Sequence, residues 1–169
     1  MKKTVKPLYT TEQRKKRDET VWTFIQGLLA PLQFIACFVS IYLVTRYLLT
    51  SDGYQIANIS VLVKTGFLLT IMVTGAIWEK VVFGQYLFAE AFFWEDMVSM
   101  VVIALHVTYV YCLFQGSLEP KYLMILALVA YATYIVNAIQ FILKLRQARK
   151  GEQANKVFQA PQMKAELQS

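Results

Sequence analysis

Long apolar runs fill the middle of the chain, and short polar stretches separate them. Three of these runs, residues 21–44, 97–114 and 122–143, come close to the roughly 20 apolar residues that a helix needs to cross a bilayer. A fourth, residues 56–78, has the right length but contains Lys64, so we expect that side chain to snorkel toward a headgroup layer. The pattern predicts an all-α integral membrane protein, a four-helix bundle.

The polar stretches divide the chain into three parts. Residues 1–20 form a basic N-terminal segment, residues 21–146 a four-span membrane domain, and residues 147–169 a flexible C-terminal tail. Between spans two and three, residues 81–94 are apolar and aromatic but too short to cross the membrane separately. That stretch either extends span two or forms a short interfacial or re-entrant segment.

Composition and charge support a membrane protein and exclude nucleic acid as a partner. Of the 169 residues, 57% are hydrophobic and only 17% charged, which is unlike a soluble domain. The net charge of +6 comes from basic residues that flank the spans rather than from one basic face. Because both termini are strongly basic, the positive-inside rule places both in the cytoplasm. The two cysteines, Cys37 and Cys112, stand apart and predict neither a disulfide framework nor a metal site.

Ionisable residues gather in one part of this apolar sequence, residues 75–106. Taking a charge out of water costs several kcal/mol unless it is paired or neutralised, so such residues tend to persist where they have a use. The predicted topology brings four of them to the cytoplasmic membrane face: Glu79, Lys80, Glu95 and Asp96.

Helical spacing aligns a polar stripe on span three, made of Glu95, Ser99, Val102, His106 and Tyr109. At about 1.5 Å per residue, His106 lies roughly 16 Å deeper than Glu95. Further polar side chains fall in the same half of the bundle, namely Gln26, Gln33, Asn137 and Gln140. The outer half has hardly any polar side chains beyond Lys64. This asymmetry predicts a polar cavity that opens to the cytoplasm, and it weakens a channel interpretation.

Each of these features also has a purely structural explanation. The acidic residues can be interface charges paired with Lys80 or lipid headgroups, and His106 can hydrogen-bond across helices. Trp78 and Trp94 are typical of membrane-interface anchors, and Asn137 and the glutamines can join helices. The pattern alone therefore indicates a polar site in a four-helix membrane bundle.

Several long motifs sharpen this interpretation, namely APLQF, IWEK, FGQYLF and FFWED. With their surroundings at residues 8–34, 72–106 and 130–149, they resemble the 3-vinyl (bacterio)chlorophyllide hydratases of anoxygenic phototrophs. The resemblance covers about residues 8–149. The chain departs from the family pattern at Glu90, where Pro is usual, and at Gln85, where a basic residue is common. Glu90 is therefore not a candidate catalytic residue.

The resemblance implies that water adds across the C3 vinyl group of a chlorophyllide to give a 3-(1-hydroxyethyl) pigment, a step of bacteriochlorophyll biosynthesis. It implies an enzyme of the cytoplasmic membrane of a phototrophic bacterium, with a pigment substrate and a lipid bilayer around it. No cofactor is expected, because the magnesium belongs to the substrate. A second copy of the chain and neighbouring pigment-pathway enzymes are further candidate partners. The family residues carried over as catalytic are Glu79, Glu95, Asp96 and His106.

The chemistry suggests a role for each. A carboxyl group buried among Phe92, Phe93 and Trp94 stays protonated, so Glu79 or Glu95 is the expected acid, while a better solvated Asp96 stabilises the developing positive charge. His106 is a candidate base for the water or axial ligand to the substrate magnesium. Lys80 meets the pigment propionate or pairs with Glu79. The expected substrate-binding residues are Gln33, Trp78, Lys80, Phe93, Trp94, Ser99 and Asn137.

Two other classes of function compete with the enzyme. A non-catalytic pigment-binding or assembly protein would need His106 but not the carboxylates. A small transporter would need polar residues that continue into the outer half of the bundle.

Overall fold

The computed structural model describes residues 8–166, and all regular structure in that range is helical. The helices are α1 (Thr11–Glu19), α2 (Val21–Thr50), α3 (Tyr54–Phe83), α4 (Phe93–Gln115) and α5 (Pro120–Glu166). Four of them, α2 to α5, are long and apolar enough to cross a membrane. The predicted all-α bundle with four candidate spans is confirmed.

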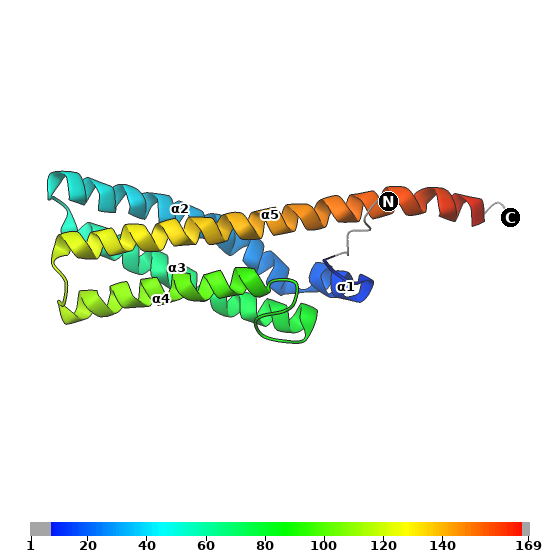
Figure 1. Ribbon diagram of the computed structural model, residues 1–169, viewed down its shortest axis with the longest axis horizontal. Helices are drawn as coiled ribbons and strands as arrows, with labels where there is room; N and C mark the ends of the chain where they lie inside the picture. The colour runs from blue at the N-terminus through cyan, green and yellow to red at the C-terminus, as the bar shows by residue number, and fades with distance from the viewer. Residues whose placement is uncertain (1–7, 167–169) are drawn as a thin grey trace.

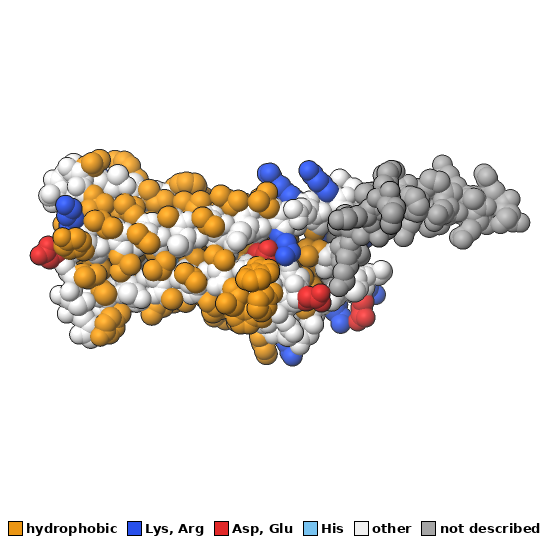
Figure 2. Space-filling view, viewed as in Figure 1, with side chains coloured by type: hydrophobic (Ala, Val, Ile, Leu, Met, Phe, Trp, Pro, Cys, Tyr) orange, Lys and Arg blue, Asp and Glu red, His pale blue; other side chains and the backbone are white. Residues whose placement is uncertain are grey.

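The four long helices lie side by side, with α2 packed along α3 and α4 along α5 (Figure 1). The α1 helix and the loop 84–92 lie at the same end of the bundle, which we call the α1 end. The far part of α5 extends beyond the bundle in the same direction (Figure 1). Apolar side chains cover the length of the visible face, and charged side chains gather toward its ends (Figure 2).

Local sequence explains where the helices begin and end. Thr10 caps α1 in a capping box, in which its hydroxyl accepts from the Gln13 N–H and the Gln13 side chain accepts from the Thr10 N–H. The α3 and α4 helices each end at a glycine in the left-handed region, Gly84 at φ 89° and Gly116 at φ 61°. Pro120 begins α5, where its missing N–H costs no helical hydrogen bond.

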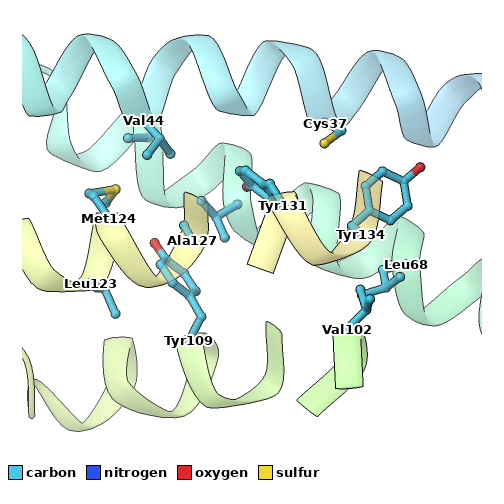
Figure 3. Packing of buried hydrophobic residues seen from close by; sticks show 12 residues of the cluster. Cys37, Val44, Leu68, Val102, Tyr109, Leu123, Met124, Ala127, Tyr131 and Tyr134 are labelled. Carbon is cyan, nitrogen blue, oxygen red and sulfur yellow. The ribbon is translucent and has the colours of Figure 1, made fainter. Parts of the chain in front are cut away.

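The main core takes side chains from all four long helices, among them Cys37, Val61, Val102 and Ala127. Figure 3 shows Tyr131 and Tyr134 of α5 in this core, between Cys37 of α2 and Val102 of α4. A second, smaller cluster lies at the α1 end around Tyr9, Val82 and Phe92. It joins α1 and the loop 84–92 to the bundle.

The prediction that Lys64 snorkels toward a headgroup layer is wrong. Lys64 is fully buried, and its Nζ lies 3.6 Å from the centre of the Tyr134 ring. It stands ten residues from the start of α3, about 15 Å along the axis, and on the face that packs against the other helices. The side chain points into the bundle because its position on the helix directs it there.

The loop and the C-terminal part differ from the predicted boundaries. The α3 helix continues five residues past Trp78 to Phe83, so part of residues 81–94 does extend span two, and a non-helical loop covers 84–92. The α5 helix continues past residue 143 to Glu166, so most of the predicted tail is helical. Good helix formers such as Lys144, Gln147 and Ala148 explain the continuation.

Polar groups are less confined to one half of the bundle than the sequence indicated. Away from the α1 end, the Tyr109 hydroxyl donates to Asn58 Oδ1, and the Ser40 hydroxyl lies 2.6 Å from that of Tyr131. These side chains are buried. The predicted asymmetry is therefore weaker than expected, although each of these groups is paired.

Replacing Tyr109 by Phe tests the buried hydrogen bond between α3 and α4. The change leaves Asn58 Oδ1 without its donor, so we expect a loss of about 0.6–1.7 kcal/mol of unfolding free energy, the range for interhelical hydrogen bonds in membranes. Thermal unfolding in detergent measures it. The control is Tyr111→Phe, at a side chain that is 62% exposed, and an equal effect of both variants would contradict the assignment.

Candidate active site

Two buried carboxyl groups meet at the α1 end of the bundle. Glu79 comes from the last turns of α3 and Asp96 from the first turn of α4, and they are 5% and 3% exposed. Their carboxyl groups lie close enough to interact with each other, through charge and through a side-chain hydrogen bond when one of them carries a proton. A hydrogen bond between two carboxyl groups requires a proton between them, because two carboxylates at that distance repel. The pair is therefore a site that holds a proton.

The loop 84–92 is attached to both carboxyl groups through its backbone. The Phe88 N–H donates to Asp96 Oδ2 at 2.7 Å, and the neighbouring Ala89 N–H donates to Glu79 Oε2 at 3.3 Å. Phe88 adopts φ +59°, a conformation that costs a non-glycine residue about 1–3 kcal/mol. These hydrogen bonds hold the strained turn of the loop over the carboxyl pair.

Glu95, next along α4, has a different environment. Both of its carboxylate oxygens lie 3.2 Å from Nζ of Lys144 on α5. One turn deeper, the Asn137 amide of α5 donates to the Ser99 hydroxyl at 2.7 Å. Of the three predicted carboxyl groups, Glu95 is thus the one with an ion-pair partner on α5 in the described structure.

The predicted polar stripe of α4 is confirmed as its buried face, since all five members are buried. His106 is nevertheless far from the carboxyl groups, because eleven residues of helix separate it from Glu95, about 16 Å. Its nearest aromatic contact is Tyr131, with ring centres 5.8 Å apart. The structure therefore brings Glu79, Glu95 and Asp96 together and leaves His106 outside their group.

The aromatic residues divide into a buried and an exposed group. Phe92 is 2% exposed and packs against the rings of Trp78 and Phe141. Phe93 and Trp94 are 41% and 71% exposed, so they do not bury a carboxyl group as the sequence analysis expected. They lie outside the buried face of α4 that contains Ser99 and Val102. The exposed aromatic patch consists of Phe88, Phe93 and Trp94, whose rings contact one another in that order.

The remaining predicted residues have simpler surroundings. Lys80 is exposed and donates to the Gly84 carbonyl at 2.8 Å, and no salt bridge joins it to Glu79 among the described residues. Trp78 donates through Nε1 to the Thr23 hydroxyl at 2.8 Å, a bond between α2 and α3. Gln33 is buried on α2. Lys80 and Trp78 thus each have a structural contact at the α1 end.

A surface cleft of about 410 Å³ lies beside the loop, between it, the residues around α1 and the end of α3. Ala89, whose N–H bonds Glu79, lines this cleft. The other lining residues include Leu8, Gln13, Phe83 and Glu90. The carboxyl pair thus lies behind the loop backbone, with the cleft on the outer side.

Two further participants could not be identified from the sequence. Lys144 was not among the predicted site residues, because its pairing with Glu95 depends on how α5 packs against α4. Phe88 carries no sequence signal for its left-handed backbone, which is uncommon for a bulky residue. Both depend on tertiary structure.

Removing Lys144 tests whether Glu95 is held as a paired carboxylate. Lys144→Met leaves a mostly buried charge without its partner, so we expect a loss of about 3–5 kcal/mol of unfolding free energy if the site stays dry, and less if water enters. Adding Glu95→Gln to that variant should recover part of the loss. Unfolding measurements on Lys144→Met, Glu95→Gln and the double variant give the coupling, with Lys150→Met at an exposed position as the control. Additive effects would contradict a direct pair.

Comparison with known proteins identifies the family. The family model of 2-vinyl bacteriochlorophyllide hydratase matches residues 9–147. A curated protein of that name from Rhodobacter capsulatus is 62% identical over 144 residues, 85% of this chain and 84% of its own. Another from Cereibacter sphaeroides is 61% identical over 143 residues, 84% of this chain and 88% of its own. No solved structure matches the chain.

The matched region contains all four long spans up to residue 147, the loop 84–92 and each predicted catalytic residue. The resemblance found in the motifs is confirmed, and the chain belongs to the 2-vinyl bacteriochlorophyllide hydratase family.

Proposed function

We propose that this chain is a hydro-lyase that adds water to the vinyl group of a bacteriochlorophyllide-type pigment. The position numbered 2 in the name of the relatives is the one numbered 3 in the systematic pigment nomenclature used above. The observation that carries a catalytic role for this end of the bundle is the contact between the buried carboxyl groups of Glu79 and Asp96. Acid-catalysed hydration of an alkene needs a positioned proton donor, and this pair supplies one.

The reaction follows from that donor. The pair transfers its proton to the terminal CH2 of the vinyl group, and the carbon attached to the macrocycle becomes cationic, with the charge spread over the ring. Water attacks that carbon through an oxygen lone pair. The proton that the attacking water loses returns to the carboxylate left on the pair, so one water is consumed and the acid is restored.

The groups next to the carboxyl pair have the remaining roles in the proposed reaction. Glu95, paired with Lys144, is a fixed negative charge one residue before Asp96, and it stabilises the cationic intermediate. The sequence left Glu79 or Glu95 as the acid beside an ionised Asp96, and the pairing of Glu95 with Lys144 favours Glu79, next to Asp96, as the donor. The reaction uses no cofactor of the protein, since the pigment brings its own magnesium.

The exposed aromatic patch is the proposed platform for the macrocycle. Phe88, Phe93 and Trp94 offer adjacent rings at the surface, directly beside the loop that covers the carboxyl pair. A large flat pigment that partitions into the membrane can stack there. Because Glu79 and Asp96 are at most 5% exposed, the loop 84–92 must shift before the vinyl group can touch them.

The proposed topology places the α1 end at the cytoplasmic face of the inner membrane of a phototrophic bacterium. Basic residues near that end support this orientation, among them Arg14, Lys15, Lys16, Arg146 and Arg149. The loop 84–92 then lies at the interface, where the pigment arrives. Contacts with a second copy or with neighbouring pathway enzymes stay predictions.

Replacing the pair tests the reaction directly. Membranes containing the protein are incubated with vinyl pigment in oxygen-18 water, and mass spectrometry follows the labelled hydroxyl. Glu79→Gln and Asp96→Asn should each slow hydration by at least about 100-fold, since neither amide donates a proton as a carboxylic acid does.

Glu119→Gln, at an exposed acidic residue near the opposite end, is the control and should keep full activity. Unchanged pigment that still co-purifies with the unaltered protein would instead indicate the pigment-binding alternative. Full activity of both carboxyl variants would remove the pair from the mechanism.

Truncating the patch tests pigment binding separately. Trp94→Ala removes one stacking surface worth about 0.5–1.5 kcal/mol, which corresponds to a rise in KM of about 2- to 13-fold. We expect kcat to change little, because Trp94 does not contact the carboxyl pair. Tyr111→Ala, an exposed aromatic residue elsewhere on α4, should leave both constants unchanged. A fall in kcat alone would contradict the platform.

A further inference from the structure

The middle of the bundle holds a second polar site, away from the carboxyl pair. Lys64 of α3 and His106 of α4 are both fully buried. Each lies near Tyr131 of α5, with Lys64 Nζ 5.9 Å from its ring centre and the His106 ring 5.8 Å from it. The two side chains also interact electrostatically with each other.

Each side chain leaves one polar atom without a hydrogen-bond partner among the described residues. Lys64 Nζ has no acceptor, and His106 Nε2 has no partner of either kind. His106 Nδ1 lies 2.8 Å from the Val102 carbonyl, which can only accept, so Nδ1 carries the hydrogen. In the neutral ring Nε2 is then an acceptor. The site therefore offers an unused donor and an unused acceptor.

Two more unpaired acceptors connect this site to the α1 end. They are Asn137 Oδ1 and Gln140 Oε1 of α5. Asn137 bonds Ser99 of α4, so both acceptors lie on the part of α5 between Tyr131 and Lys144. We call this strip, from Glu95 and Lys144 to His106 and Tyr131, the α4–α5 seam.

The polar atoms of Lys64 and His106 determine which kind of ligand this site can bind. A metal ion is disfavoured because the Lys64 ammonium repels a cation beside Nε2. An anion is disfavoured because the lone pair of His106 Nε2 would repel it. A macrocycle does not fit, since the surrounding Val102, Tyr109 and Tyr131 are at most 1% exposed. Water both accepts and donates, and buried water typically pairs such orphaned atoms.

We propose that ordered water molecules occupy the α4–α5 seam, with one bridging Lys64 Nζ and His106 Nε2. This water accepts from the Lys64 ammonium and donates to the imidazole, and others donate to Asn137 and Gln140. The site stores water inside an apolar bundle. This water is also a source for the hydration reaction, a role that rests on the proposed function.

The single histidine makes the site directly observable. The full-length protein is labelled with nitrogen-15 histidine, placed in lipid nanodiscs and studied by solid-state NMR. We expect a protonated Nδ1, an unprotonated Nε2, and magnetisation transfer from water protons to Nε2. In Lys64→Met the transfer should fall at least twofold, whereas Lys121→Met at an exposed position should leave it unchanged.

Several outcomes overturn the proposal. One is absence of transfer from water to Nε2 in the unaltered protein, which does not depend on how any variant folds. Another is equal transfer in Lys64→Met and the unaltered protein. A third is an Nε2 shift caused by the magnesium pigment but not by the same pigment without its metal, which would make His106 a magnesium ligand. None of these readouts uses turnover, so failure of the water site and failure of the hydratase function are distinguishable.

Discussion

The contact between the Glu79 and Asp96 carboxyl groups is the constraint on which the α1 end depends. Two acidic groups can remain adjacent and nearly dry only while a proton lies between them. That contact joins the end of α3 to the beginning of α4, and the Phe88 and Ala89 N–H groups attach the intervening loop to it. One pair of side chains thus holds two helices and a strained turn together, which explains how Phe88 keeps its unfavourable backbone conformation.

The rest of the bundle follows the same requirement, that polar groups inside a membrane need partners. Lys144 pairs with Glu95, Asn137 with Ser99, and Tyr109 with Asn58, each across two helices. These bonds also set the register of α4 against its neighbours. Protein partners run out for Lys64 Nζ, His106 Nε2, Asn137 Oδ1 and Gln140 Oε1 among the described residues, and buried water commonly pairs such atoms.

The apolar runs predicted the four long helices and the buried face of α4, and the motifs predicted the family. Helical periodicity was sufficient for the buried stripe of α4, because the same spacing that aligns Glu95 with His106 directs both inward. Tertiary pairing was not predictable: whether Asp96 meets Lys80 or Glu79, and whether Lys144 reaches Glu95, depends on how helices far apart in sequence pack. Lys64 was misassigned for that reason, since a shift of one or two residues along a helix decides whether a side chain faces lipid or the core.

The separation of His106 from the carboxyl groups limits what a single active site can contain. A vinyl group spans only two carbons, so no substrate position lets Glu79 protonate it while His106, about 16 Å deeper than Glu95, activates the attacking water. In the proposed mechanism, proton donation and water capture therefore both occur at the α1 end, near the loop. A dry, protonated pair favours proton transfer, but substrate and water must still reach it. The loop 84–92 can keep the pair dry and still admit substrate and water, because its two backbone hydrogen bonds can break and re-form while the helices stay packed.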